Sequence, residues 1–586
     1  MDFGILNVLA LLCGLALFLY GMDVMGDSLK KSAGNRLKTI LGQLTSSPIK
    51  GFLLGLGVTS IIQSSSATTV MVVGFVNSGT MTLLQAAGVI IGANVGTAVT
   101  SWLTALSGAG DSSLAFLQYL KPDTWMPILA VIGICLTMFS KGKKKDIGAI
   151  LLGFAVLMTG MEMMGDAVAP LKDNDAFKSI LTMFDDNPIL GVLAGTVLTA
   201  IVQSSSASVG ILQSLTMTGV ISYNAAIPII MGQNIGTCVT AMLSALGANK
   251  NGKRAALVHL YFNVIGVVLV LGGYSILNAI VGFGLDQVMI DPWGVALVHT
   301  LFKIIVVALL FPFYKLLVKL AMLTIKDKPD EEESTSLLDD RLLDTPAVAV
   351  ERAAQVTRDM ADIAYKAINE AFLLMEEEYD PKRAALVRDL ETKADGYEDA
   401  LGSYLVKVSS CDIGGRDSRE VTKLLHIIGD LERISDHAVN IAESVEELRD
   451  KKISFSDEAK RELGVLRGAV KEILTLTYES FMQNDLDRAL DIEPLEQVVD
   501  DLRDMIKKGH IMRRQKIECT IEHGFVLSDL LTNLERIADH CSNIGGCVIE
   551  ISAFDSFDMH KYLASVKHGS ERYDSTYKRY SEQYSI

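Results

Sequence analysis

The sequence predicts an all-α protein in which a polytopic membrane domain, built from two inverted repeats with re-entrant hairpins, precedes a soluble helical bundle. Three observations support this prediction. Up to Lys326 the chain is apolar, with 19 basic and 14 acidic residues, whereas the remainder is polar, with 34 basic and 55 acidic residues. Polar motifs recur at an offset of 140 residues inside the apolar part. In the acidic part, apolar residues recur at helical spacing and proline is rare.

Each repeat of the apolar part is expected to cross the membrane three times and to contain one hairpin that returns to the side it entered from. The basic clusters around Lys30, Lys143 and Lys253 are expected in the cytoplasm, and the acidic loops at 111–123 and 173–186 outside. An odd number of crossings inverts the second repeat, with the N-terminus outside. Hairpins that crossed fully would put the basic clusters on both sides. The expected hairpins are 48–76 and 188–220, and the expected crossings are 5–25, 82–106, 125–140, 147–165, 224–247, 255–281 and 293–323.

The expected domains follow from these segments. The membrane domain is 1–325, with repeats at 5–140 and 147–281 and an extra helix at 293–323. A polar linker at 326–345 leads to a cytoplasmic helical domain at 346–565, which ends in a polar tail at 566–586.

Two pairs of polar motifs mark a candidate binding site in the membrane domain. Gln-Ser-Ser-Ser occurs at 63–66 and again at 203–206, and Gly-x-Asn-x-Gly-Thr occurs at 92–97 and again at 232–237. Such side chains are costly in hydrocarbon unless they line a site or a wet cavity. We therefore expect one site built from both repeats, although Ser and Thr can also bond back to helix carbonyls. The candidate residues are Gln63, Ser64, Ser65, Ser66, Thr68, Asn94, Thr97, Gln203, Ser204, Ser205, Ser206, Ser208, Asn234 and Thr237.

The chemistry of these residues suits a small oxyanion together with a hard cation. Helix N–H groups that begin inside the membrane attract anions, and Ser, Thr, Gln and Asn oxygens are ligands for a small cation. Asp23 and Glu162 occupy equivalent repeat positions and are expected either at the site or as interfacial caps. His259 and His299 are expected to form interhelical hydrogen bonds, with a proton-linked role as the alternative. The sequence leaves open whether Lys303 snorkels or faces the cavity.

The acidic domain has its own repeat, in which Leu-Glu-Arg-Ile-x-Asp-His occurs at 431–437 and 534–540. Carboxylates at i and i+4 share a helix face, and four such pairs predict a metal-binding face, with a solvated acidic face as the alternative. The acidic balance excludes a nucleic-acid-binding role. The candidate metal ligands are Glu391, Asp395, Glu432, Asp436, Glu496, Asp500, Glu535 and Asp539.

In these motifs the chain resembles the bacterial branch of the sodium/phosphate cotransporter family, with a C-terminal PhoU-like domain. The resemblance implies a protein of the inner (plasma) membrane that uses sodium as coupling ion to move inorganic phosphate, with both bound at the hairpins and the Asn/Thr motifs. It implies iron or zinc on the PhoU-like carboxylates and a role in sensing phosphate status. The family pattern has Asn at the position of Lys303. This departure leaves open whether the last helix, 293–323, contributes to ion binding.

The function expected from the sequence is therefore a sodium-dependent phosphate symporter that works by alternating access and is not an enzyme. Its expected partners are phosphate, sodium and membrane lipid, with a second copy of the chain or a phosphate-signalling protein as further candidates. The alternatives are a non-transporting phosphate sensor and a transporter of another small oxyanion. A di-iron enzyme is disfavoured because the bundle lacks a Glu-x-x-His pair.

Overall fold

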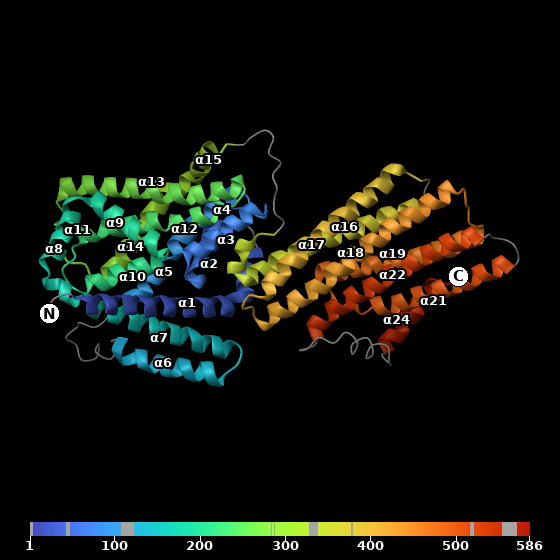
Figure 1. Cartoon of the computed structure of the whole chain (residues 1–586), viewed down its shortest axis with the longest axis horizontal. Helices are drawn as coiled ribbons and strands as arrows, with labels where there is room; N and C mark the ends of the chain where they lie inside the picture. The colour runs from blue at the N-terminus through green and yellow to red at the C-terminus, as the bar shows by residue number, and fades with distance from the viewer. Residues whose placement is uncertain are drawn as a thin grey trace. The chain divides into compact units, whose positions relative to one another are not determined.

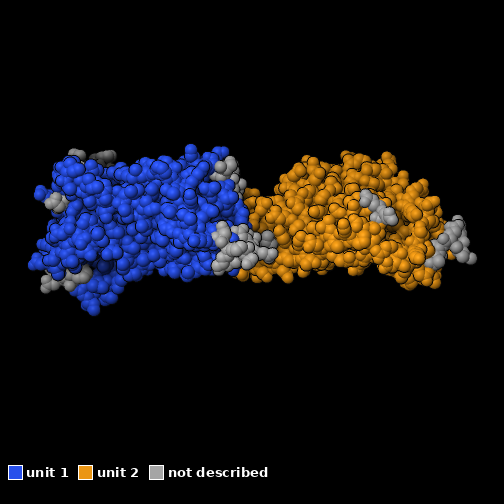
Figure 2. Space-filling view, turned by 90° about the horizontal axis from the view of Figure 1, so that it is seen from above, with its two compact units in different colours: residues 1–348 blue, residues 349–586 orange. Residues whose placement is uncertain are grey.

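The computed structural model confirms an all-α fold. It describes residues 4–42, 47–106, 122–282, 284–285, 287–326, 338–376, 379–515, 521–553 and 571–586. Apart from one isolated bridge, between Ser222 and Met289, the described residues contain no β-structure. The chain divides into two compact units, Met1–Val348 and Ala349–Ile586 (Figure 2). Residues 111–121 of the predicted acidic loop and residues 327–337 of the predicted linker lie outside the described residues.

Unit 1 contains the helices that were predicted for the membrane (Figure 1). Within it, α1, α7 and α6 lie side by side, and α13 lies across the opposite side of the unit in Figure 1. The helices are α1 (Ile5–Gly42), α2 (Pro48–Ile62), α3 (Ser65–Asn77), α4 (Leu83–Gly96), α5 (Ala98–Ala105), α6 (Pro122–Phe139), α7 (Lys143–Val168), η3 (Ala169–Asp173), α8 (Asp175–Asp186), α9 (Pro188–Val202), α10 (Ser205–Thr216), α11 (Tyr223–Gly236), α12 (Cys238–Ser244), α13 (Lys250–Val281), α14 (Pro292–Leu310), η4 (Phe311–Phe313), α15 (Tyr314–Thr324) and η5 (Asp340–Asp344).

Six helical segments among the described residues are long and apolar enough to cross a membrane, and a seventh is added if the bent pair α8 and α9 is one span. The six fall on six of the seven predicted crossings. The remaining crossing, at 125–140, corresponds to α6, whose apolar stretch Trp125–Phe139 is shorter. The surfaces of α1, α13 and α14 expose many large apolar side chains, as lipid-facing helices do. Unit 1 is therefore a multi-pass membrane unit.

Two helix pairs, α2 with α3 and α9 with α10, form the predicted hairpins. Their members have 15 and 13 residues and 15 and 12 residues, and each is shorter than the roughly 20 residues that a membrane crossing needs. Each pair breaks at the glutamine of its Gln-Ser-Ser-Ser motif. Gln63 has φ of 60° and Gln203 has φ of 56°, the left-handed region that non-glycine residues rarely adopt. The same turn therefore occurs in both repeats.

Glycines allow each hairpin to pack against the helix that follows it. A Cβ added at Gly55 of α2 would lie 1.9 Å from the carbonyl oxygen of Val89 on α4. A Cβ added at the repeat-related Gly195 of α9 would lie 2.1 Å from the carbonyl oxygen of Ile229 on α11. These positions require glycine because the two backbones touch.

Glycines also set the contact between α1 and α7. A Cβ added at Gly21 would lie 2.4 Å from the backbone nitrogen of Leu157, and one added at Gly153 would lie 2.7 Å from that of Met25. A Cβ at Gly160 would lie 2.4 Å from the backbone nitrogen of Phe18. The first helices of the two repeats are thus in direct backbone contact.

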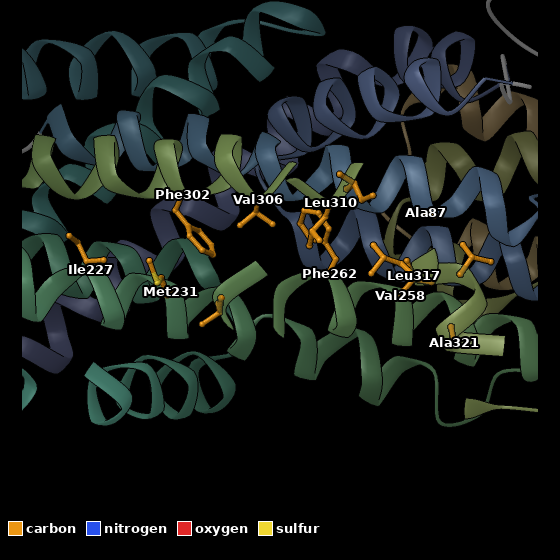
Figure 3. Packing of buried hydrophobic residues seen from close by; sticks show 13 residues of the cluster. Ala87, Ile227, Met231, Val258, Phe262, Phe302, Val306, Leu310, Leu317 and Ala321 are labelled. Carbon is orange, nitrogen blue, oxygen red and sulfur yellow. The ribbon is translucent and has the colours of Figure 1, made fainter. Parts of the chain in front are cut away.

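A shared core joins the later helices of unit 1 (Figure 3). Phe262 and Val258 of α13 pack with Phe302 and Val306 of α14, and Met231 of α11 lies in the same cluster. Beyond this core, α13 packs on α3 and α12, whereas α14 packs on α10 and α5. Each of these two helices therefore contacts the hairpin of one repeat and the broken span of the other.

Residues 338–345, the end of the predicted linker, belong to unit 1 and pack on its helices; we call them the docking segment. Leu342 is fully buried and packs near Gly74 of α3. The Nε of Arg341 donates a hydrogen bond of 2.8 Å to the carbonyl oxygen of Ser244, at the end of α12. The docking segment thus contacts one hairpin of repeat one and one helix of repeat two.

Unit 2 is a bundle of long helices in which the two sequence repeats pack together. α18 and α22, which carry the repeated Leu-Glu-Arg-Ile motif, pack against each other. The predicted polar tail contains helix α24, which packs on α21 and whose Tyr577 hydroxyl donates a hydrogen bond to Asp501 of that helix. The helices are α16 (Pro346–Glu376), α17 (Pro381–Ser409), α18 (Gly415–Asp450), α19 (Asp457–Gln483), α20 (Leu486–Ala489), α21 (Ile492–Gln515), α22 (Ile521–Ala553) and α24 (Glu571–Gln583).

Candidate functional site

The two Gln-Ser-Ser-Ser motifs face one cavity in unit 1. Its volume is about 250 Å³, below the roughly 300–1,000 Å³ of pockets that hold drug-sized molecules. The side chain of Asp27 at this cavity is 64% exposed, so the cavity reaches the surface of the unit. The size suits a small, hydrated ion. The lining residues are Leu19, Met22, Asp23, Gly26, Asp27, Lys30, Ile62, Gln63, Ser64, Ser65, Ser66, Gln203, Ser204, Ser205 and Ser206.

The cavity receives the N-termini of two helices, α3 and α10. Ser64 caps α3 by accepting a hydrogen bond of 3.1 Å from the Ala67 N–H, and Ser204 caps α10 by accepting one of 3.2 Å from the Ala207 N–H. The N–H groups of Ser65 and Ser205, at the first position of each helix, have no intrahelical acceptor. Together with the positive ends of both helix dipoles, they favour an anion in the cavity.

Paired hydroxyls hold the two helices of each hairpin together behind the turn. Thr59 donates a hydrogen bond of 3.0 Å to Thr68, and Thr199 donates one of 2.8 Å to Ser208. Both pairs are buried. Thr68 and Ser208, which the sequence suggested as ligands, therefore occupy equivalent positions that brace the hairpins and do not line the cavity.

The second pair of motifs, Gly-x-Asn-x-Gly-Thr, is buried in unit 1. Asn94, Thr97, Asn234 and Thr237 are at most 4% exposed and do not line the cavity. Thr97 and Thr237 donate hydrogen bonds to carbonyl oxygens four residues earlier. This is the alternative role considered for the polar residues, in which Ser and Thr bond back to their own helix. Both motifs interrupt a span, α4 breaking from α5 at Thr97 and α11 from α12 at Thr237.

The two halves of the site are not identical. Gln63 is 6% exposed, and its Oε1 accepts a hydrogen bond of 2.8 Å from Thr100. Gln203 is exposed to the cavity, and the described residues offer its side chain no hydrogen-bond partner. Thr240, the repeat-related partner of Thr100, donates instead to Ser66 at 3.2 Å and so links repeat two to the first hairpin.

Helix α1 supplies three charged residues that the sequence did not assign firmly to the site. Asp23, Asp27 and Lys30 all line the cavity, and Lys30 forms an ion pair of 3.0 Å with Asp27. Their spacing places them on one helix face, which was the available signal. Glu162, the repeat-related residue of Asp23, lines a separate cavity with Thr159. The three side chains include two acidic groups and one basic group, and this excess of acidic groups favours a cation beside the anion.

Three buried polar residues on α13 and α14 lie close to the second motifs. His299 shares a hydrogen bond of 2.8 Å with the hydroxyl of Ser101 on α5, the interhelical role that was predicted. His259 is equally buried, and its Nδ1 has no partner among the described residues. Lys303 does not snorkel: it is 4% exposed, and its Nζ donates a hydrogen bond of 2.6 Å to the carbonyl oxygen of Asn94.

The structure does not support the predicted metal-binding face of unit 2. No group of three or more His, Cys, Asp or Glu residues suited to a metal occurs among the described residues. In the second repeat, Arg503 lies between the carboxylates and pairs with Glu535 at 2.6 Å and with Asp500 at 3.4 Å. In the first repeat, burial, followed by the neighbouring Asp436, raises the pKa of Glu432 to about 7. The remaining predicted ligands are Glu391, Asp395, Glu496 and Asp539, which form no such group either.

The repeated motifs of unit 2 meet at a pair of histidines. The rings of His437 and His540 stack with their centroids 5.6 Å apart. His437 Nδ1 lies 2.8 Å from Asn533 Oδ1, and His540 Nδ1 lies 2.9 Å from Asp430 Oδ1. Asn533 and Asp430 precede the two Leu-Glu-Arg-Ile motifs at equivalent positions, so each histidine contacts the opposite repeat.

Comparisons with known proteins agree with this architecture. The Na+/Pi-cotransporter family matches residues 17–166 and 156–290, and the PhoU domain matches residues 357–445 and 465–548. No solved structure matches the chain.

Three relatives illustrate the range of similarity. A protein of Escherichia coli (strain K12) named "Putative inorganic phosphate export protein YjbB" is 25% identical over 558 residues, 93% of this chain and 98% of that protein. The "Uncharacterized protein YqeW" of Bacillus subtilis (strain 168) is 31% identical over 53% of this chain and 96% of that protein. "Sodium-dependent phosphate transport protein 2A" of Rattus norvegicus is 38% identical over 20% of this chain and 18% of that protein. Given the paired hairpins, the shared cavity and these matches, the chain belongs to the Na+/Pi-cotransporter family and carries a C-terminal PhoU domain.

Proposed function

We propose that this protein moves inorganic phosphate across the membrane, coupled to sodium, by alternating access. The observation that carries the proposal is the cavity in which both Gln-Ser-Ser-Ser turns meet. Two helix N-termini and the serine hydroxyls would hold the oxyanion, and Asp23 and Asp27 would favour sodium beside it. The rat relative named as sodium-dependent supports the choice of ions.

The accessible side of the cavity follows from the basic cluster of α1. Lys30 lines the cavity, and basic residues that flank a span favour the cytoplasm. In this proposal the described conformation is therefore open to the cytoplasm, and the PhoU unit lies on the same side, where it regulates transport. The E. coli relative is named for phosphate export, so the direction of net transport is part of the test.

Flux of radiolabelled phosphate in proteoliposomes tests the proposal. Gradients of sodium in both directions, with potassium as the substitute, measure coupling and direction, and excess sulfate or arsenate measures selectivity. Ser65→Ala and Ser205→Ala should abolish flux, because each removes a hydroxyl from the cavity. Ser179→Ala, on exposed α8, is the matched control and should transport normally. Normal flux in both site variants would refute the site, and phosphate binding without flux would favour the sensor alternative.

A further inference from the structure

A further cavity of unit 1 shares no lining residue with the cavity of the two Gln-Ser-Ser-Ser turns. Its volume is about 430 Å³. This volume lies within the roughly 300–1,000 Å³ of pockets that hold drug-sized molecules. Its walls belong to the start of α4, the start of α13, and α15. These three helices pack against one another, with α15 beside α13 in Figure 1. The cavity is therefore a candidate for a ligand other than the transported ion.

Three basic side chains line this cavity, and none of its described lining residues is acidic. Two of the three, Lys315 and Lys319, are four residues apart on α15, so they share one helix face, and both are exposed. The described residues offer neither lysine an ion-pair partner. The surrounding helices cannot supply one, because α4, α13 and α15 contain no Asp or Glu. This excess of basic groups favours an anionic ligand.

The third basic residue, Arg254, holds the wall of the cavity in place. It is 4% exposed, and its Nε and Nη2 donate hydrogen bonds of 3.0 and 2.7 Å to the carbonyl oxygen of Ile325. The guanidinium thus ties the end of α15 to the start of α13. Leu317 of α15 also packs in one core with Val258 of α13 (Figure 3). The two lysines are therefore presented on a helix that protein contacts already fix, which lowers the cost of ordering the site.

Apolar side chains form another part of the lining, and they indicate which kind of anion fits. Leu83 and Leu84 of α4 and Val318 and Met322 of α15 line the cavity. Leu84 is 46% exposed and Met322 is 45% exposed, so the cavity opens on the surface of the membrane unit. A free phosphate ion has no use for such walls, whereas a phospholipid places an acyl chain next to its phosphodiester. Lysine stems can also lie along apolar surface with the amino group at its edge.

We propose that this cavity binds one anionic phospholipid. Its phosphodiester lies beside Lys315 and Lys319, and an acyl chain lies along Leu84 and Met322. Basic pockets between membrane helices are sites at which anionic headgroups bind. Because the lipid contacts α4, α13 and α15 together, it stabilises the packing of α15 on the other two helices.

Titration of phosphatidylglycerol into the full-length protein in detergent, followed by native mass spectrometry, tests the proposal. The wild type should bind one phosphatidylglycerol more tightly than phosphatidylcholine with the same acyl chains. The double variant Lys315→Gln with Lys319→Gln should bind phosphatidylglycerol about thirtyfold more weakly, which corresponds to about 1 kcal/mol for each lysine. The matched control, Lys143→Gln with Lys144→Gln, removes two exposed lysines outside the cavity and should bind as the wild type does. Size-exclusion chromatography and thermal unfolding show that each variant is folded.

Four results would overturn the proposal. Equal losses in the two double variants would show that the lysines act only through the overall charge of the unit. Equal affinity of the wild type for the two lipids would exclude a site for an anionic headgroup. Binding of radiolabelled inorganic phosphate that falls in the Lys315 and Lys319 variant, but not in the control, would assign the lysines to the free ion. Self-association of the wild type that the same variant abolishes, without bound lipid, would assign the surface to a second copy of the chain.

Discussion

The carboxamide of Asn77 donates a hydrogen bond of 2.7 Å to the carboxylate of Asp339, 262 residues further along the chain. Asn77 ends the first hairpin, and its Oδ1 also accepts a hydrogen bond of 2.6 Å from the backbone N–H of Asn249, at the start of α13. One side chain thus joins the hairpin of repeat one, the last helix of repeat two, and the docking segment. The docking segment leads directly into α16, so a regulatory signal from the PhoU unit, as proposed above, would reach the first hairpin along the chain itself.

Asp339→Ala should release the docking segment. It removes the acceptor for Asn77 and the partner of Arg341, both at a buried carboxylate, and such losses cost about 1–3 kcal/mol. Hydrogen exchange of the full-length protein should then show faster exchange for residues 338–345 and for the end of α3. Asp340→Ala, at the exposed neighbouring position, is the control. Equal exchange in the two variants would contradict the anchoring role of Asp339.

Gly55→Ala should prevent correct packing of the first hairpin. The new Cβ would lie 1.9 Å from the Val89 carbonyl oxygen, so the backbones must separate. Overpacking of side chains costs about 1–3 kcal/mol, and a backbone contact has less room to adjust. Gly57→Ala, two residues along the same helix and without any neighbour within 4 Å, should fold normally. Thermal unfolding in detergent compares the two, and similar unfolding temperatures would show that the predicted clash is absorbed.

Gln203 offers a way to separate backbone strain from ligand binding. Its φ of 56° favours glycine, so Gln203→Gly should be more stable than Gln203→Ala by about 1 kcal/mol. Both variants remove the carboxamide from the cavity, and both should therefore lose phosphate flux to a similar degree. Thermal unfolding and proteoliposome flux measure the two effects. Wild-type flux in either variant would remove Gln203 from the site.

Glu432 should make the stability of the PhoU unit depend on pH. Its pKa is raised to about 7 in the folded state by burial and by Asp436, so the protonated form is the favoured one. From pH 4.5 to pH 7 the folded state binds more protons than the unfolded state, and the free energy of unfolding falls as the pH rises. Glu432→Gln should stabilise the unit at pH 8 by on the order of 1 kcal/mol, because water still reaches the half-buried carboxyl group and screens its interactions, and should have no effect at pH 4.

Thermal unfolding of the full-length protein as a function of pH, followed in the PhoU unit, measures this effect. Asp436 is one of the groups that raise the pKa of Glu432, so the paired variant Asp436→Asn should lower the pKa of Glu432 and reduce the slope. An identical pH dependence of the wild type and Glu432→Gln would contradict the assignment.

The hairpins could be predicted from the sequence because their polar motifs recur with the same spacing in both repeats. The charged face of α1 could not be assigned to the site, because charged residues near the end of an apolar helix are equally expected as caps at the membrane interface. Asp23 and Glu162 are equivalent in sequence, yet they line different cavities. Their difference arises from packing between helices that are distant in sequence.

Two further elements could not be predicted from the sequence, because their structure depends on tertiary contacts. The docking segment reads as a polar linker, and its fully buried apolar anchor is Leu342. Helix α24 reads as a polar tail, although Tyr573, Tyr577, Tyr580 and Tyr584 recur at helical spacing. Their role becomes visible only with their partners, such as Asp501 for Tyr577 and Glu472 for Tyr584.

The glycine contacts between α1 and α7 have a mechanical consequence. Gly21 and Gly153 bring the two backbones together, so these helices cannot slide or separate without losing the contact along much of their length. One helix belongs to each sequence repeat, but the pair must travel as a single rod. In the proposed alternating-access cycle, the boundary between moving and stationary parts therefore cannot coincide with the boundary between the repeats.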